Sequence, residues 1–137
     1  MKSNRRSFLK QSSLVMAGCS FAASSESSFD APFVHHVLFW LNDKDDKENH
    51  TKMYRFLKKF KDVKGVKFLH VGTPSVSDVD YEAHATDVTY TLSYLTLFDS
   101  KKDKEEYLKD PLHVQFFNEF KDVVSKVVIY DSLHLAD

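Results

Sequence analysis

Cysteine, glycine and arginine are scarce in this chain of 137 residues, and each shortage excludes a class of protein. Cys19 is the only cysteine, so the chain has no internal disulfide. Three glycines leave no glycine-rich loop of the kind that holds phosphate groups. The sequence also lacks a Gly-x-Ser-x-Gly turn, which presents the nucleophile of many hydrolases. A phosphate-binding loop and a serine-hydrolase site are therefore excluded.

The charge balance beyond residue 18 argues against a nucleic-acid partner. Residues 1–18 carry four basic side chains and no acidic one, so 15 of the 19 basic residues remain beside all 20 acidic residues, a net charge of −5. Arg55 is then the only arginine. Nucleic acids and anionic lipid surfaces are bound by clustered cationic side chains. We therefore expect no nucleic-acid binding and no electrostatic attachment to a membrane.

Residues 1–18 have the layout of a signal peptide. Their basic motif, Asn4-Arg5-Arg6-Ser7-Phe8-Leu9-Lys10, resembles the twin-arginine export signal and precedes a mildly apolar run over residues 14–23. That run is too short to remain in a bilayer as a spanning helix. These features predict export to the periplasm-facing side of a bacterial membrane.

Cys19 is the expected site of lipid attachment. Met16-Ala17-Gly18-Cys19 resembles the processing box of lipoproteins, with methionine in place of the usual leucine. The alternative is ordinary cleavage after Ala22. Residues 19–32 are rich in serine and alanine and have no helical or strand period, which indicates a tether. The protein would then reach the membrane only through its lipid anchor, with a folded domain over residues 33–137.

Apolar periodicity in residues 33–137 predicts an α+β domain. We expect strands over 34–41, 66–73, 88–98 and 126–132, a loop over 74–87, and a helix whose buried stripe contains Met53, Phe56, Leu57 and Phe60. Ser100 and Asp110 have the positions of helix caps, and Pro111 suits a first helical position. The order strand, helix, strand, strand, helix pair, strand is the βαββαβ arrangement of ferredoxin-like domains.

The first strand indicates a second copy of the chain. His36, Leu38 and Trp40 point to one side of it, and the intervening residues 35, 37, 39 and 41 point to the other. Both sides are largely apolar, whereas two helical stripes cover only one face of a sheet. Packing two such sheets face to face buries the remaining face, so we expect a homodimer.

Tyr107 and His113 form the candidate site. His113 falls in the first turn of the helix that begins at Pro111, near the positive end of the helix dipole, which favours a neutral imidazole. A neutral imidazole can accept a proton. The alternative is structural, with His113 capping and Tyr107 packing at the end of the preceding helix.

Four segments together resemble the Dabb family of stress-responsive dimeric α/β-barrel domains, over residues 34–132. They are His36-Val37-Leu38-Phe39-Trp40, Leu97-Phe98-Asp99-Ser100, Tyr107-Leu108-Lys109-Asp110-Pro111-Leu112-His113-Val114 and Lys126-Val127-Val128-Ile129-Tyr130-Asp131. The resemblance implies a ferredoxin-like fold that dimerises into a barrel, in agreement with the burial argument.

The resemblance also implies a site in a cavity between helices and sheet. A plant polyketide cyclase of this family uses a tyrosine and a histidine there, which fall here on Tyr107 and His113, and a first-strand histidine that matches His36. Its third-strand histidine is replaced here by Leu92. Because a fold persists while its chemistry changes, this difference leaves the reaction and the substrate open.

The predicted chemistry is abstraction of a proton from a carbon next to a carbonyl group, as in a cyclase or isomerase, with no cofactor. His113 accepts the proton, Tyr107 holds the carbonyl oxygen, and His36 orients the substrate or a water. Trp40 and Phe117 are the candidates for contacts with a small carbonyl or aromatic ligand.

Two other functions remain open. One is a non-catalytic dimeric lipoprotein that binds a small apolar ligand or a protein partner. The other is haem handling, since haem-degrading monooxygenases share this fold class. A metal site is not expected, because His35 and His36 face opposite sides of a strand and the other histidines lack ligand spacing.

Overall fold

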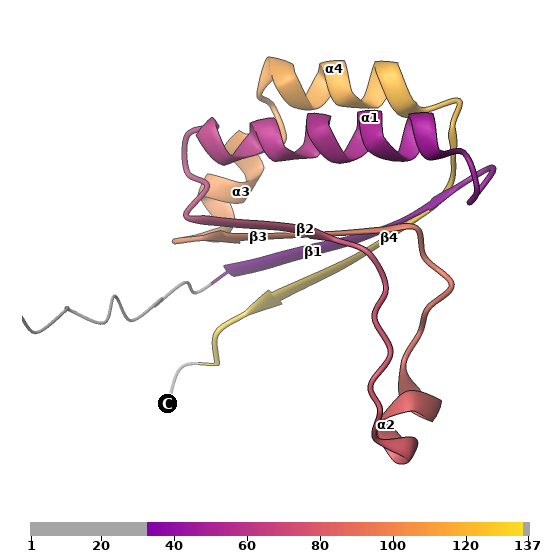
Figure 1. The fold of residues 1–137 in the computed structure, drawn as a ribbon. Coiled ribbons are helices and arrows are strands. Elements are labelled where there is room, and N and C mark those ends of the chain that lie inside the picture. The colour runs from indigo at the N-terminus through magenta and orange to yellow at the C-terminus, as the bar shows by residue number, and fades with distance from the viewer. Residues whose placement is uncertain (1–32, 136–137) are drawn as a thin grey trace, which may run out of the picture.

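The computed structural model describes residues 33–135, in which four strands form one antiparallel sheet with α1, α3 and α4 on a single side of it (Figure 1). The strand order β2-β3-β1-β4 places β1 and β3 in the centre. This is the ferredoxin-like α+β fold that the sequence predicts. In chain order the elements are β1 (Phe33–Leu41), α1 (Lys47–Leu57), the 3-10 helix η1 (Lys58–Asp62), β2 (Phe68–Gly72), α2 (Asp80–Ala85), β3 (Leu92–Phe98), α3 (Lys101–Tyr107), α4 (Pro111–Phe120) and β4 (Val124–Leu133).

The structure corrects the sequence prediction between β2 and β3. Residues 74–87, expected to be a loop, contain α2, a helix of six residues that is too short to give a periodic signal. β3 begins at Leu92 and not at residue 88, because Thr89 bonds to a side chain of β1 and does not extend the β3 ladder. The predicted signal peptide, the lipidation site Cys19 and the tether over 19–32 lie outside the described residues. None of the described helices is long and apolar enough to cross a lipid bilayer.

Two caps hold the helices that carry the candidate site. Ser100 Oγ accepts a hydrogen bond from the Asp103 amide at 3.1 Å and thereby starts α3. The Asp110 carboxylate accepts one from the Leu112 amide at 2.8 Å, and Pro111 follows as the first residue of α4. Both caps confirm the sequence prediction, because a side-chain acceptor satisfies an amide that the helix leaves unpaired.

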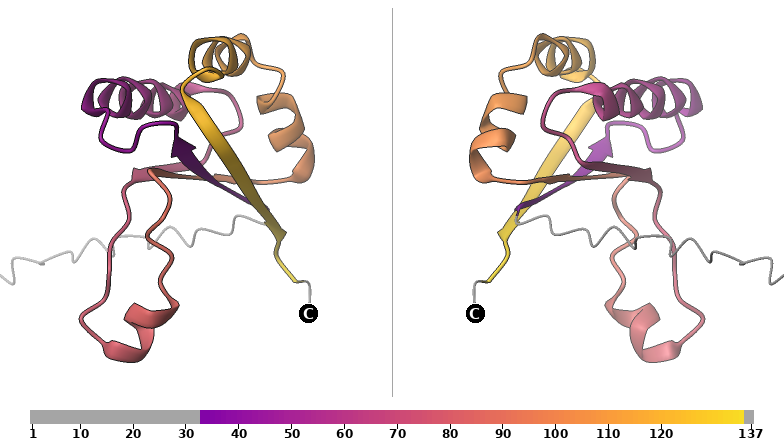
Figure 2. Two further views of the ribbon diagram at one scale, coloured as in Figure 1. Left: turned by 90° about the vertical axis from the view of Figure 1, so that its right-hand side faces the viewer. Right: turned by 90° about the vertical axis from the view of Figure 1, so that its left-hand side faces the viewer.

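The pairing register of β1 decides which side chains face the helices. His35 lies opposite Thr96 of β3 and Asp131 of β4, and the next residue, His36, lies opposite Tyr130 of β4. Neighbouring residues of a strand point to opposite faces. His35, Thr96 and Asp131 therefore face the helices. His36 and Tyr130 face the other side of the sheet, which α1, α3 and α4 leave uncovered (Figure 2).

Aromatic side chains fill the space between sheet and helices. Phe60 of η1 is only 1% exposed, and its ring lies edge-on to Tyr94, Tyr107 and Phe116 at centroid distances of 5.9, 5.4 and 6.0 Å. Such edge-to-face pairs stabilise a core beyond the area they bury. Phe60 thus links η1 to β3, α3 and α4, and the core continues without a break into the candidate site.

Replacing Phe60 by alanine should lower the free energy of unfolding by about 3–5 kcal/mol, because the change leaves a cavity among rings that cannot collapse into it. Urea denaturation followed by far-UV circular dichroism measures the loss. Phe117→Ala is the matched control, since Phe117 is 63% exposed and its loss should cost about 1 kcal/mol or less. Equal losses in the two variants would contradict the packing described here.

Candidate functional site

A pocket of about 300 Å³ lies between the sheet and the helices. Most of its lining is apolar, and its polar groups come from His35 of β1, Tyr94 of β3, Tyr107 of α3 and His113 of α4. Its remaining lining residues are Val37, Phe39, Leu57, Phe60, Leu108, Phe116, Phe117, Val127 and Ile129. An apolar cavity with a few convergent polar groups is the usual form of a small-molecule site.

The pocket opens to solvent between α4 and β4. Three of its lining side chains, Phe117, Val127 and Ile129, are exposed. Phe117, predicted to contact a ligand, is therefore placed where a ligand would enter. Tyr94 and Tyr107, by contrast, are buried, and each is 2% exposed.

Tyr107 and His113 meet in this pocket. Their rings lie edge-on with centroids 5.4 Å apart, and the Tyr107 hydroxyl lies 2.9 Å from the Tyr94 hydroxyl. Burial raises the pKa of both tyrosines, so both phenols stay protonated and one of them can donate a hydrogen bond to a ligand. The structure thus brings together the two residues that the sequence singles out, and their catalytic roles stay a prediction.

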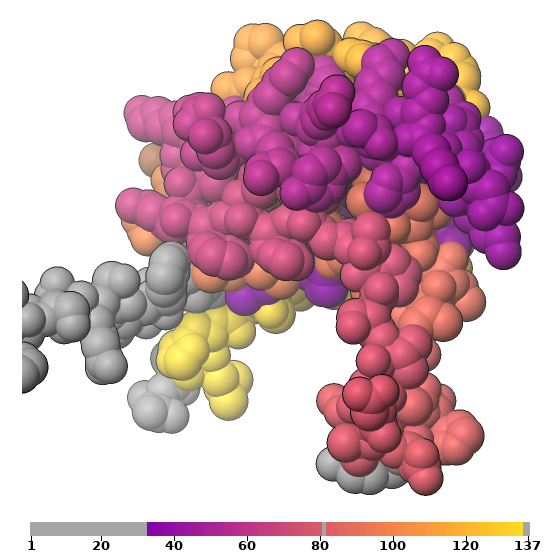
Figure 3. All heavy atoms as spheres, in the orientation of Figure 1, coloured from indigo at the N-terminus to yellow at the C-terminus, as the bar shows by residue number. Residues whose placement is uncertain are grey.

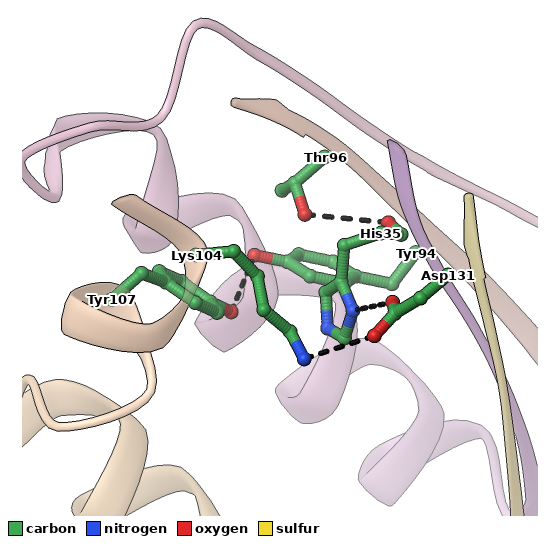
Figure 4. A network of polar contacts seen from close by, with 6 residues as sticks. All are labelled: His35, Tyr94, Thr96, Lys104, Tyr107 and Asp131. Carbon is green, nitrogen blue, oxygen red and sulfur yellow. Dashed lines mark hydrogen bonds and ion pairs between the residues drawn. The ribbon is translucent and has the colours of Figure 1, made fainter. Parts of the chain in front are cut away.

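His35 adds a second imidazole that is held by a carboxylate. Its Nδ1 lies 2.6 Å from Asp131 Oδ1, and Lys104 Nζ lies 2.9 Å from Asp131 Oδ2 (Figure 4). An ionised carboxylate only accepts hydrogen bonds, so Nδ1 of a neutral His35 carries the proton. The lone pair then sits on Nε2, on the side of the ring away from Asp131. This is the arrangement of an oriented general base.

Burial keeps both imidazoles neutral. It lowers the pKa of His35 and outweighs the hydrogen bond that His35 donates to Asp131, which raises that pKa. It also lowers the pKa of His113, and the positive charge that His35 can acquire lowers it further. Partial burial opposes ionisation of Asp131, but its hydrogen bonds with His35 and Lys104 hold its pKa below the ordinary value. At neutral pH the site therefore holds two neutral bases and one carboxylate.

His36 and Trp40 do not belong to this pocket. His36 Nε2 lies 2.9 Å from Ser93 Oγ on the sheet face away from the helices, and Trp40 shares that face. The prediction that His36 orients a substrate with His113 and Tyr107 is therefore wrong in its placement, and so is the prediction that Trp40 contacts the same ligand. The reason is strand alternation: the neighbouring residue, His35, points to the helices.

Sequence reasoning missed His35, Asp131 and Lys104. Alternation along β1 places His35 on the same face as Val37 and Phe39. Had that face been predicted to pack against the helices, His35 would have been a candidate site residue. No comparable signal identified Asp131 or Lys104, because their meeting depends on the pairing of β1 with β4 and on the position of α3. Among residues 33–135, no three histidine, cysteine, aspartate or glutamate side chains are placed to share a metal ion.

A comparison with known protein families identifies the family to which this chain belongs. The sequence profile of the stress responsive A/B barrel domain, Dabb, matches residues 33–133. The chain belongs to the Dabb family. A comparison with curated proteins finds no match.

Solved structures similar to this Dabb domain share its fold at low sequence identity. A protein of Arabidopsis thaliana has 23% identity and a TM-score of 0.61, over 77% of this chain and 98% of that chain. A dimeric protein of unknown function and ferredoxin-like fold from Bacteroides fragilis has 18% identity and a TM-score of 0.56, over 74% and 95%. A hydroxynitrile lyase from Passiflora edulis has 16% identity and a TM-score of 0.59, over 78% and 97%. These likenesses show the fold alone.

The neutral imidazoles of this Dabb domain should make its stability fall in acid. The pKa values of His35 and His113 lie below the ordinary 6.5 in the folded state, so the unfolded chain takes up protons first as the pH drops below 6.5. The free energy of unfolding should therefore decrease between about pH 7.5 and about pH 5.5, which urea titrations at a series of pH values measure.

The double variant His35→Gln with His113→Gln should flatten that pH dependence. His84→Gln is the control, because His84 is exposed at the tip of the β2–β3 connection and far from the pocket. A native pH slope in the double variant would contradict the assignment of the acid sensitivity to these two rings.

Proposed function

We propose that the pocket binds a small aromatic or apolar compound with a carbonyl group and abstracts a proton from the carbon beside that carbonyl. The observation that carries this proposal is the His35–Asp131 pair, in which the bond at Nδ1 leaves Nε2 as a base inside an apolar pocket. The apolar walls suit an aromatic ring, and the buried hydroxyls supply donors for the carbonyl oxygen.

The residues divide the chemistry between them. His35 Nε2 takes the proton, and Asp131 holds the ring in the productive tautomer and stabilises the imidazolium that forms. The electron pair left on carbon moves to the carbonyl oxygen and gives an enolate. Tyr107, whose hydroxyl contacts Tyr94, donates a hydrogen bond to that oxygen together with neutral His113.

The fixed tautomer favours His35 over His113 as the base. His113, the base assigned from the sequence, lies on the same pocket at a ring distance of 5.4 Å from Tyr107, which suits a donor to the same oxygen. The hydroxynitrile lyase similar in fold supports the idea that this fold can carry an enzyme. The reaction assigned to this chain rests on the pocket geometry.

Deuterium exchange tests the reaction without knowledge of the natural substrate. A panel of small aryl methyl ketones, starting with acetophenone, is incubated with the protein in D₂O, and nuclear magnetic resonance measures exchange at the methyl group. We expect catalysed exchange that falls by about 10²–10⁴-fold in His35→Gln. Tyr107→Phe and His113→Ala should reduce it as well.

The matched control is His36→Gln, which removes the neighbouring imidazole from the opposite face of the sheet. It should leave the exchange unchanged. If His36→Gln and His35→Gln behave alike, the catalytic proposal fails. Saturable binding of the ketones with no exchange would instead favour a non-catalytic ligand-binding protein, which the apolar lining of the pocket also suits.

We also propose that the domain works as a homodimer. The helices α1, α3 and α4 cover only one face of its sheet, and the family is named for a barrel. A second copy packed on the uncovered sheet face would complete that barrel. The Bacteroides fragilis protein of the same fold is described as dimeric, which supports this proposal.

Export and lipid attachment at Cys19 are proposed from the N-terminal motifs. Intact-mass spectrometry of the protein from its host membrane should show a chain that begins at Cys19 and carries a diacylglyceryl group. Cys19→Ser should abolish the lipid mass. A chain cleaved after Ala22, with no lipid, would contradict the anchor and leave export intact.

A further inference from the structure

The connection between β2 and β3 is far longer than two paired neighbouring strands require. Residues 73–91, here named the arm, join Gly72 to Leu92, whereas hairpin loops commonly contain about two to five residues. The arm carries α2 at its tip and leaves the sheet on the side opposite α1 and α4 (Figures 1 and 2). The pocket lies on the helix side, so the arm is not a lid for the pocket of its own chain.

Contacts with β1 fix the position of the base of the arm. Trp40 Nε1 donates a hydrogen bond to Thr89 Oγ1 at 3.0 Å, and the Trp40 ring lies edge-on to Tyr90 at 6.3 Å. The Thr91 amide donates to the carbonyl oxygen of Phe39 at 2.7 Å. The returning half of the arm is thus fixed to β1. Trp40, assigned to the ligand from the sequence, supports the arm instead.

The arm presents apolar side chains to solvent. Val76, Val79 and Val88 are 56, 46 and 46% exposed. The space-filling view shows the arm as a lobe that stands off the body, with the end of β4 projecting from the same side (Figure 3). These valines offer apolar contact area on a segment that projects from the body of the domain.

The sheet face beside the arm is not covered by α1, α3 or α4, and it carries apolar side chains around the hydrogen-bonded pair His36 and Ser93. The alternation of the strands places an apolar set on it, namely Val34, Leu38, Trp40, Leu95, Leu97 and Val128. The sheet is open, with β2 and β4 at its edges. The arm projects from one end of the sheet into the space that a facing sheet would occupy.

We propose that the arm clasps a second copy of this chain, with Val76 and Val79 packed against the partner subunit beside the uncovered sheet face. This inference rests on the homodimer proposed above. A second copy is the occupant that the structure favours, because it brings an identical open sheet to the face from which the arm projects. Two copies related by a two-fold axis would each hold the other with one arm.

Sedimentation of the full chain tests the clasp. The double variant Val76→Asp with Val79→Asp should raise the dimer dissociation constant by about tenfold or more, because it places two charges in an apolar contact. Val114→Asp is the matched control, since Val114 is an equally exposed valine, 54%, on α4 and outside the pocket. The control should dimerise as the native chain does.

A photo-reactive benzophenone side chain at position 79 gives a second readout that does not depend on affinity. Irradiation should join two chains, and peptide mapping should place the bond on the uncovered sheet face or the neighbouring end of β4. The same group at position 114 should not join chains.

The outcomes separate the clasp from the proposals on which it rests. A native dimer that the double variant leaves intact, or bonds from position 79 within one chain only, overturns the clasp and leaves the homodimer standing. A monomeric native chain overturns both, while the ketone exchange assay still decides the reaction in the pocket.

Discussion

The pairing register of β1 with β3 and β4 determines which side chains of this domain face the pocket. It sets His35 opposite Asp131 and both of them toward the helices. A slip of one residue would exchange the two faces of the strand and bring His36 to the pocket in place of His35. The ion pair of Asp131 with Lys104 depends on that alignment as well, because it requires Asp131 to face the helices.

Some side chains belong both to the packed core and to the lining of the pocket. Phe60 contacts Phe56 in the core and Tyr107 in the pocket, and its ring also lies 6.0 Å from that of His113. Burial lowers the pKa values of His35 and His113, and the Tyr107 ring lies beside both imidazoles. Because burial lowers these pKa values, a change that exposes the two rings to water would alter their protonation as well as the stability.

The fold was largely predictable from the sequence, because it depends on local signals. The caps at Ser100 and Asp110, the break at Pro111 and the apolar stripe through Phe60 each occupy a few neighbouring residues. Local spacing also joined Tyr107 to His113. The rest of the site could not be obtained in this way. His35 meets Asp131 through strand pairing across almost a hundred residues, and Lys104 reaches Asp131 from α3. The choice between His35 and His36 required knowledge of which face the helices cover.

A single sheet lies between the pocket and the arm, so its two faces have separate roles. Alternate positions of β1 serve different ends: His35 and Phe39 line the pocket, whereas His36 and Trp40 belong to the opposite surface. Mutational drift on one set of positions need not disturb the other. Related chains could therefore change their ligands while keeping their partners, or change their partners while keeping their ligands, within one unaltered backbone.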